Sequence, residues 1–187
     1  MRRKALVSLV LVAAILGRPA QAQDITQHLD QIGAGSYLVF ESGGRNFTQV
    51  FRGLSGQTYV IDLVEGRDPN GQRLSREYRN GLGQLIRVDF SNGMSMRFAP
   101  HNCQRTLGAC EFVQTGSDGD TRQGRVVTAV GDGYSYELSI FSSSGQDPVL
   151  VESGHLGLDD RGTVVSGKIT AQDGSTQQIT LVQAVYR

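Results

Sequence analysis

The sequence predicts an all-β fold: an antiparallel up-and-down meander of about ten to twelve short strands, forming a barrel-like or strongly curved sheet. The first observation is that apolar and polar residues alternate in short segments from residue 36 to the end of the chain. The second is that glycine-containing turn signals separate these segments, among them Asn80-Gly81, Asn92-Gly93 and Asp173-Gly174. Asn-Gly and Asp-Gly tolerate a left-handed backbone and are typical of hairpins. Short hairpins pair strands that are consecutive in sequence.

Each expected strand is a segment of period-two alternation that ends at a turn signal. The segments are 36–41, 46–53, 57–65, 72–79, 84–90, 94–99, 110–115, 124–130, 134–141, 149–157, 163–171 and 175–186.

The register of one hairpin follows from the apolar pattern. A three-residue loop at 91–93 sets Phe90 opposite Met94 and Val88 opposite Met96, so that both strands bury the same face. A shorter loop would split the faces, because a slip of one residue moves every side chain across the sheet.

The same reasoning predicts two further three-residue loops, at 79–81 and 131–133. They set Tyr78 opposite Leu82 and Val130 opposite Tyr134. For the last hairpin, around Asp173-Gly174, two registers fit the apolar residues equally well.

The N-terminus reads as a secretory signal peptide. Arg2, Arg3 and Lys4 precede an apolar run at 5–16, and the small residues of Ala20-Gln21-Ala22 mark a cleavage site after Ala22. The apolar run is shorter than the ~20 residues that span a bilayer. We therefore expect a mature chain of residues 23–187 that forms a single all-β domain, without a transmembrane segment, in the periplasm or outside the cell.

A short helix is expected at 24–33, directly after the cleavage site. Asp24 can cap it, Ile25, Leu29 and Ile32 fall on one face, and Gly33 ends it. A helix this short needs a packing partner, and the mouth of a sheet or barrel is the expected one.

The charge of the mature chain argues against nucleic acid as a partner. Residues 1–22 contain four bases and no acid, whereas the whole chain has 18 of each, so the mature chain has an excess of acid. Nucleic-acid binding depends on a basic surface, and no basic cluster is present.

The two cysteines, Cys103 and Cys110, are expected to form a disulfide, as an even pair in an exported protein usually does. The rival interpretation is a metal site that adds His101. It lacks Cys-x-x-Cys spacing and a fourth ligand nearby, so no metal and no cofactor are expected.

No catalytic motif is present. The three histidines, His28, His101 and His155, are not accompanied by a Gly-x-Ser-x-Gly nucleophile elbow. The sequence therefore favours a non-enzymatic binding protein. An extracytoplasmic hydrolase with a dispersed active site and a structural or assembly module of the cell envelope are the alternatives.

The candidate ligand-binding residues are apolar side chains predicted on one face, together with one arginine on a neighbouring strand. They are Met94, Met96, Phe98, Tyr134, Tyr136 and Arg76. The expected partner is a small apolar ligand in the barrel interior, or a protein that contacts the disulfide-stapled loop between Pro100 and Cys110. A pocket that brings a histidine to a serine would instead favour the hydrolase.

Overall fold

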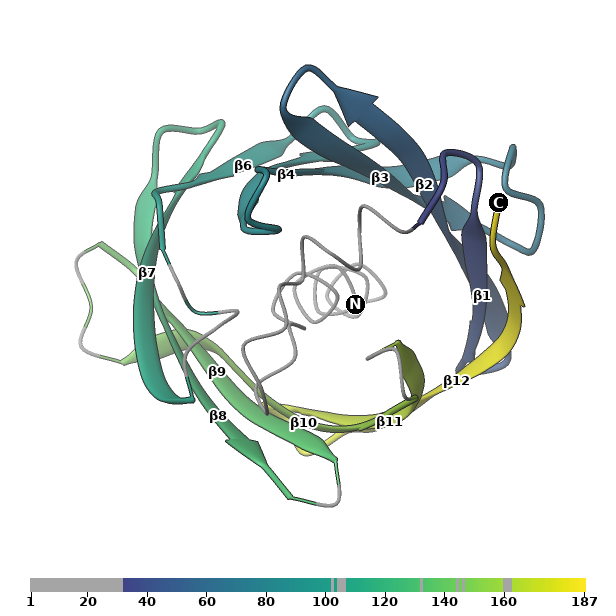
Figure 1. Ribbon diagram of the computed structural model, residues 1–187. Coiled ribbons are helices and arrows are strands. Elements are labelled where there is room, and N and C mark those ends of the chain that lie inside the picture. The colour runs from purple at the N-terminus through teal and green to yellow at the C-terminus, as the bar shows by residue number, and fades with distance from the viewer. Residues whose placement is uncertain are drawn as a thin grey trace.

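The chain forms a closed antiparallel β-barrel of twelve strands, in which each strand pairs with its neighbours in sequence (Figure 1). The computed structural model describes residues 32–101, 103, 107–131, 133–143, 145, 147–159 and 163–187. The described part contains no helix. The predicted signal peptide and most of the predicted helix at 24–33 lie outside these residues and remain predictions.

The twelve predicted strands all form, with bounds that differ by a few residues. They are β1 (Tyr37–Ser42), β2 (Arg45–Ser55), β3 (Thr58–Glu65), β4 (Arg73–Arg79), β5 (Leu85–Phe90), β6 (Ser95–Phe98), β7 (Gly108–Gly116), β8 (Thr121–Val130), β9 (Tyr134–Phe141), β10 (Pro148–Leu158), β11 (Val164–Ala171) and β12 (Thr176–Val185).

The barrel closes where the first strand meets the last. β1 pairs with β2 on one side and with β12 on the other. The side chain of Ser42 reinforces the closure: its hydroxyl donates to the carbonyl of Gln178 at 2.6 Å and accepts from the amide of Gln177 at 2.7 Å. The Arg187 carbonyl accepts from the Gly33 N–H at 3.1 Å, which ties the two ends of the described chain together.

Two of the predicted registers are confirmed. Val88 lies opposite Met96 and the Phe90 N–H donates to the Met94 carbonyl, as the loop at 91–93 requires. Val130 lies opposite Tyr134. The undecided hairpin uses a turn at 172–174, which sets Thr170 opposite Thr176.

The register predicted for the loop at 79–81 is wrong. Tyr78 pairs with Arg87 instead of Leu82, because residues 80–84 form a longer connection. The Asn80 side-chain oxygen accepts from the N–H groups of Leu82 and Gln84, both at 3.0 Å, and Gly83 takes a positive φ of 73°. This local hydrogen bonding outcompetes strand pairing there.

The connection between β3 and β4 folds over the outer face of the wall. Thr48 and Val64 point outward yet are fully buried, since the Thr48 hydroxyl donates to the Gly66 carbonyl at 2.7 Å and Gly71 packs near Val64. Residues 60–64, which are apolar except for Asp62, are therefore buried on both faces in this part of the barrel.

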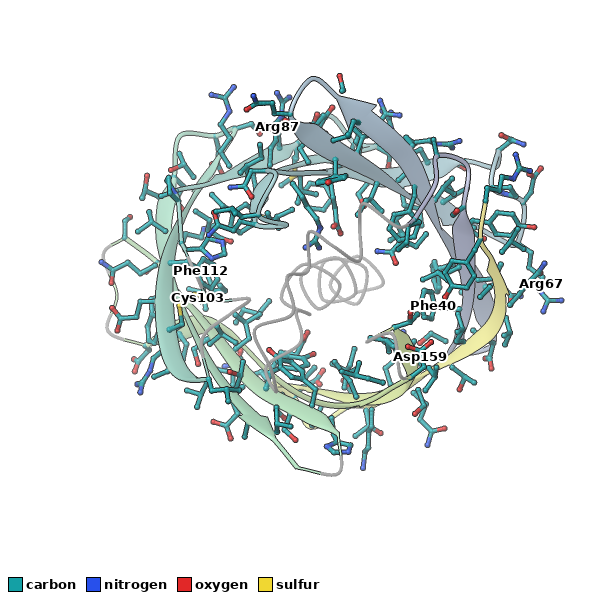
Figure 2. All side chains as sticks on the ribbon, viewed as in Figure 1. Phe40, Arg67, Arg87, Cys103, Phe112 and Asp159 are labelled. Carbon is teal, nitrogen blue, oxygen red and sulfur yellow. A yellow bond between two sulfur atoms is a disulfide. The ribbon has the colours of Figure 1, made fainter. Side chains whose placement is uncertain are left out.

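The two faces of the wall differ in chemistry. Phe40 and Phe112 point into the barrel, whereas Arg67 and Arg87 point away from it (Figure 2). Among the described residues, no helix is long and apolar enough to cross a bilayer.

Candidate binding site in the barrel interior

The inner wall is mainly apolar except on β4, where Ser75, Glu77 and Arg79 face inward. Directly paired residues share a face, so the inward direction of Phe112 extends through Gly124 on β8 to Ile140 on β9. By the same rule, Phe47 points inward on the opposite side of the barrel, because it pairs with the inward-pointing Phe40. The buried apolar residues of this main cluster include Leu63, Leu85, Val88, Met96, Phe98, Val126, Leu138, Leu156, Ile169 and Ile179.

Four of the five predicted apolar ligand residues lie on this inner wall. Met96, Phe98, Tyr134 and Tyr136 are buried in the main cluster, from β6 and β9. Met94 lies in the β5–β6 turn with 54% of its surface exposed. Whether these residues bind a ligand stays a prediction.

Arg76 lies on the outer wall, apart from the other predicted residues. Its guanidinium donates to both oxygens of Asp62, at 2.6 and 2.9 Å, and Arg52 donates to the same carboxylate at 2.9 Å. Burial raises the pKa of Asp62, but the hydrogen bonds from Arg76 and Arg52 outweigh burial and hold that pKa below its ordinary value. Since Arg76 already has a carboxylate partner in the chain, it is unsuited to anchor a ligand inside the barrel.

A buried ion pair lies on the inner wall of β4, where sequence reasoning placed none. Arg79 donates to one carboxylate oxygen of Glu77 at 2.9 and 3.2 Å and to the Gly83 carbonyl at 3.1 Å. Both side chains are only 4% exposed. Burial raises the pKa of Glu77, and the charge of Arg79 opposes the rise.

This pair was missed because the apolar residues of β4, Leu74 and Tyr78, alternate with Glu77 and Arg79, so the sequence pattern favoured the opposite face as the buried one. The signal that existed is the register of β3, where Leu63 lies opposite Ser75 and fixes Ser75, Glu77 and Arg79 as inward.

A second polar group lies on the inner wall of β9 and β10. The Tyr136 hydroxyl donates to Glu152 at 2.7 Å, and both residues are buried. Burial, with the nearby Glu152 carboxylate, raises the pKa of Tyr136. Burial raises the pKa of Tyr134 to about 12. Both phenols therefore keep their protons at neutral pH, and Tyr136 donates its proton to Glu152.

The predicted disulfide between Cys103 and Cys110 is present, with a Cα–Cα distance of 5.3 Å. His101 lies beside it and packs between Phe98 and Phe112, with ring centroids 6.3 and 5.6 Å away. Burial lowers the pKa of His101, and the charge of Arg79 lowers it further.

The metal site considered for His101 and the cysteines is not formed by these residues, because both sulfurs are in the disulfide. Over the described ranges, no group of three or more metal-ligating side chains comes together. Residues 102 and 104–106 of the stapled loop lie outside the described residues, so its suitability for a protein partner stays a prediction.

A groove of about 340 Å³ lies on the outer wall, over β8 to β11. It is lined by Ser135, Glu137, Ser153, His155 and Lys168, among others. The Ser135 hydroxyl lies 2.9 Å from Nδ1 of His155, because the two residues are direct partners on β9 and β10. Sequence reasoning named His155 but had no means of pairing it with Ser135, which is 20 positions away.

Comparison with known proteins finds no matching family model, no matching curated protein and no matching solved structure.

Proposed function

We propose that the protein is a non-enzymatic carrier that binds a small, mainly apolar molecule inside its barrel. The observation that carries the proposal is the apolar inner wall of a barrel with twelve strands. The outer wall carries charged residues such as Arg76 and Arg87, so the continuous apolar surface of this molecule faces inward.

The size of the barrel supports an occupant. Twelve strands spaced about 4.8 Å apart and tilted by about 40° enclose a backbone radius of about 12 Å. Side chains reach about 5 Å from a sheet, as the ~10 Å spacing of packed sheets implies. Barrels of more than about eight strands are wide enough to hold a ligand or a channel, and this radius is in accord with an occupant.

The inner polar groups suggest the ligand's chemistry. Ser75 Oγ and Gln114 Oε1 are buried on this wall and have no hydrogen-bond partner within the described part of the chain. Ligand sites are commonly apolar with a few placed polar groups that fix orientation. The ligand class that fits is an apolar body with a hydrogen-bonding head group.

Native mass spectrometry of the mature protein, purified without denaturant, tests the proposal directly. We expect a reproducible additional mass that disappears on denaturation. The protein stripped of this mass should bind N-phenyl-1-naphthylamine, a probe whose fluorescence rises in apolar surroundings.

Met96→Gln and Met94→Gln form a matched pair for this assay, because the swap keeps the volume and adds polarity. Met96→Gln should weaken probe binding about tenfold, equivalent to ~1.4 kcal/mol, whereas Met94→Gln should not change it. A bare chain that binds no probe would overturn the proposal. If a variant that begins at Ile32 then binds the probe, the chain's own residues 23–31 fill the barrel.

A second candidate function, hydrolysis, is favoured by one observation, the contact between Ser135 and His155 in the outer groove. A serine beside a histidine is the core of a nucleophilic site. Such a site also needs N–H donors for the oxyanion. Ser135 is paired with Ala129 on β8 and with His155 on β10. The backbone around it is therefore part of the sheet and does not form a separate set of N–H donors for an oxyanion.

Labelling with a fluorophosphonate tests this second function. Modification that is lost in Ser135→Ala and kept in Ser153→Ala, a serine of the same groove, would establish it. Equal labelling of both variants, or none in the wild type, would rule it out.

A further inference from the structure

The inner face of β4 places three polar side chains in one line on a wall that is mainly apolar elsewhere. Ser75, Glu77 and Arg79 face inward, and each is at most 3% exposed. The direct partners of Ser75 and Glu77 on β3 and β5 are all apolar: Leu63, Phe90, Ile61 and Val88. These partners therefore offer no side-chain hydrogen bond to Ser75 or Glu77.

The polar atoms of this line are only partly satisfied. Arg79 donates to Glu77 and to the Gly83 carbonyl, and both of its hydrogen bonds to the carboxylate are accepted by Oε2. The second carboxylate oxygen, Oε1, is left as an acceptor. The Ser75 hydroxyl is fully buried and has no hydrogen-bond partner in the described part of the chain. Because a buried polar atom without a partner is costly, a group that supplies the missing hydrogen bonds would be held here.

The open atoms all accept hydrogen bonds. Arg79 keeps its charge at neutral pH, and an uncharged Glu77 would leave that buried charge without a counter-ion, so Glu77 Oε1 is a carboxylate acceptor. The Ser75 hydroxyl can accept as well as donate. On β7, Gln114 Oε1 is a further buried oxygen without a partner over the described ranges, and it too is an acceptor. A ligand group that satisfies these atoms therefore has to donate a hydrogen bond.

The charge of the site argues against an ionic head group. Glu77 and Arg79 form a buried pair of opposite charges, which balance each other. A ligand carboxylate has no proton to donate at neutral pH and would face the open oxygen of Glu77. A ligand ammonium would add a second positive charge beside Arg79 in a buried place. An uncharged hydroxyl has neither defect, since it can donate to Glu77 and accept from Ser75.

We propose that Ser75 and Glu77 form the head-group subsite of the barrel and that the ligand is an apolar molecule with an uncharged hydroxyl group, such as a long-chain alcohol. The two residues are two positions apart on one strand, about 7 Å, so one hydroxyl between their side chains can contact both. This inference rests on the proposed carrier function, but the preference among head groups is measured separately from binding itself.

Displacement of N-phenyl-1-naphthylamine from the stripped mature protein tests the inference. The competitors are 1-dodecanol, its isomer 1-methoxyundecane, which has no donor, and dodecanoate and dodecylammonium below their micelle concentrations. We expect the alcohol to bind about tenfold more tightly than the ether, because a hydrogen bond to a charged acceptor is among the stronger ones. Both ions should bind more weakly than the alcohol.

The double variant Glu77→Met with Arg79→Met removes the acceptor without leaving a buried charge unpaired. It should keep the probe and lose the preference for the alcohol, so that the ratio of the alcohol and ether affinities falls to about one. Comparing this ratio between wild type and variant cancels the difference in how well the two competitors dissolve in water.

Ser75→Ala and Ser42→Ala form a matched pair that tests the second residue and does not depend on the folding of the double variant. Both serines are buried, but the Ser42 hydroxyl already has two partners in the chain. Ser75→Ala should weaken alcohol binding about threefold, whereas Ser42→Ala should not change it.

Three results would overturn the head-group assignment while the carrier function stands: equal binding of alcohol and ether by the wild type, tighter binding of either ion, or an alcohol preference that survives in the double variant. Equal effects of Ser75→Ala and Ser42→Ala would remove Ser75 from the subsite and overturn its placement. A wild type that binds neither the probe nor any competitor would overturn the carrier function and the assignment together.

Discussion

At the scale of single residues, one carboxylate, that of Asp62, accepts hydrogen bonds from two arginines, Arg52 and Arg76. Its side chain is 3% exposed, while the two arginines are about one-third exposed. The carboxylate of Asp62 is thus shielded from solvent, whereas the two arginines around it are partly exposed. Removing its charge should cost more than removing a charge from an exposed pair, since exposed pairs contribute only about 0–1 kcal/mol.

We predict that Asp62→Asn lowers the free energy of unfolding by about 1–3 kcal/mol at neutral pH, measured by urea denaturation. The pKa of Asp62 is lower in the folded state than its ordinary value of 3.8. The stabilisation is therefore complete above the unfolded-state pKa and is lost as pH falls through the lower folded-state pKa. The difference between wild type and variant should shrink over that acidic range.

Asp89→Asn is the matched control. Asp89 also accepts from an arginine, Arg87, at 2.6 Å, but its side chain is 23% exposed. A smaller loss is expected. Equal losses in the two variants, or a gap between Asp62→Asn and wild type that is constant down to acid unfolding, would contradict the ion-pair explanation.

At the scale of strand pairs, glycines opposite aromatic residues shape the inner wall. Gly124 lies opposite Phe112 on β7, and Gly154 lies opposite Tyr136 on β9. A Cβ added at either glycine would meet the facing aromatic ring. The ring packs over the bare backbone, an arrangement that compensates for the poor strand propensity of glycine.

We predict that Gly124→Ala destabilises the barrel by about 1–3 kcal/mol, because the new methyl group forces the Phe112 ring from its position. Phe112→Leu in the same chain should recover part of the loss. Gly81→Ala is the control: its φ is not positive and nothing lies within 4 Å of an added Cβ. Urea denaturation of all four chains gives the comparison, and equal effects at Gly81 and Gly124 would refute the packing explanation.

At the scale of the whole molecule, stability depends on the closure of β1 against β12. Every other strand pair joins neighbours in sequence, whereas Tyr37 pairs with Val185 across nearly the whole described chain. Closure leaves no strand of the barrel with an open edge, which removes the template for assembly through strand pairing. The envelope-assembly alternative therefore has no edge strand to use in the folded barrel.

Deletion of residues 176–187 should convert the barrel into larger oligomers or aggregates than the full-length chain forms, because β1 and β11 both become open edges. Size-exclusion chromatography with light scattering measures this. A truncated chain with the same oligomeric state and circular dichroism as the full-length chain would show that closure contributes little.

The sequence by itself determined the features that depend on neighbouring residues. Alternation and turn residues defined twelve strands, Gly93 and Gly133 marked two correct hairpin registers, and the cysteine pair predicted the disulfide. Each of these signals is local, because a hairpin is specified by its own turn and by side chains a few positions away.

Tertiary structure decided what depends on distant parts of the chain. Barrel closure needs β1 beside β12, the inward direction of Glu77 and Arg79 is imposed by β3, and the contact of Ser135 with His155 arises from strand register. The apolar residues of β4, Leu74 and Tyr78, indicated the wrong face, and only the pairing with β3 places Glu77 and Arg79 inward. An alternating pattern shows which face of a strand is apolar. It does not distinguish a charged pair buried inside the barrel from a charged pair exposed to solvent, because both appear as polar residues in the sequence.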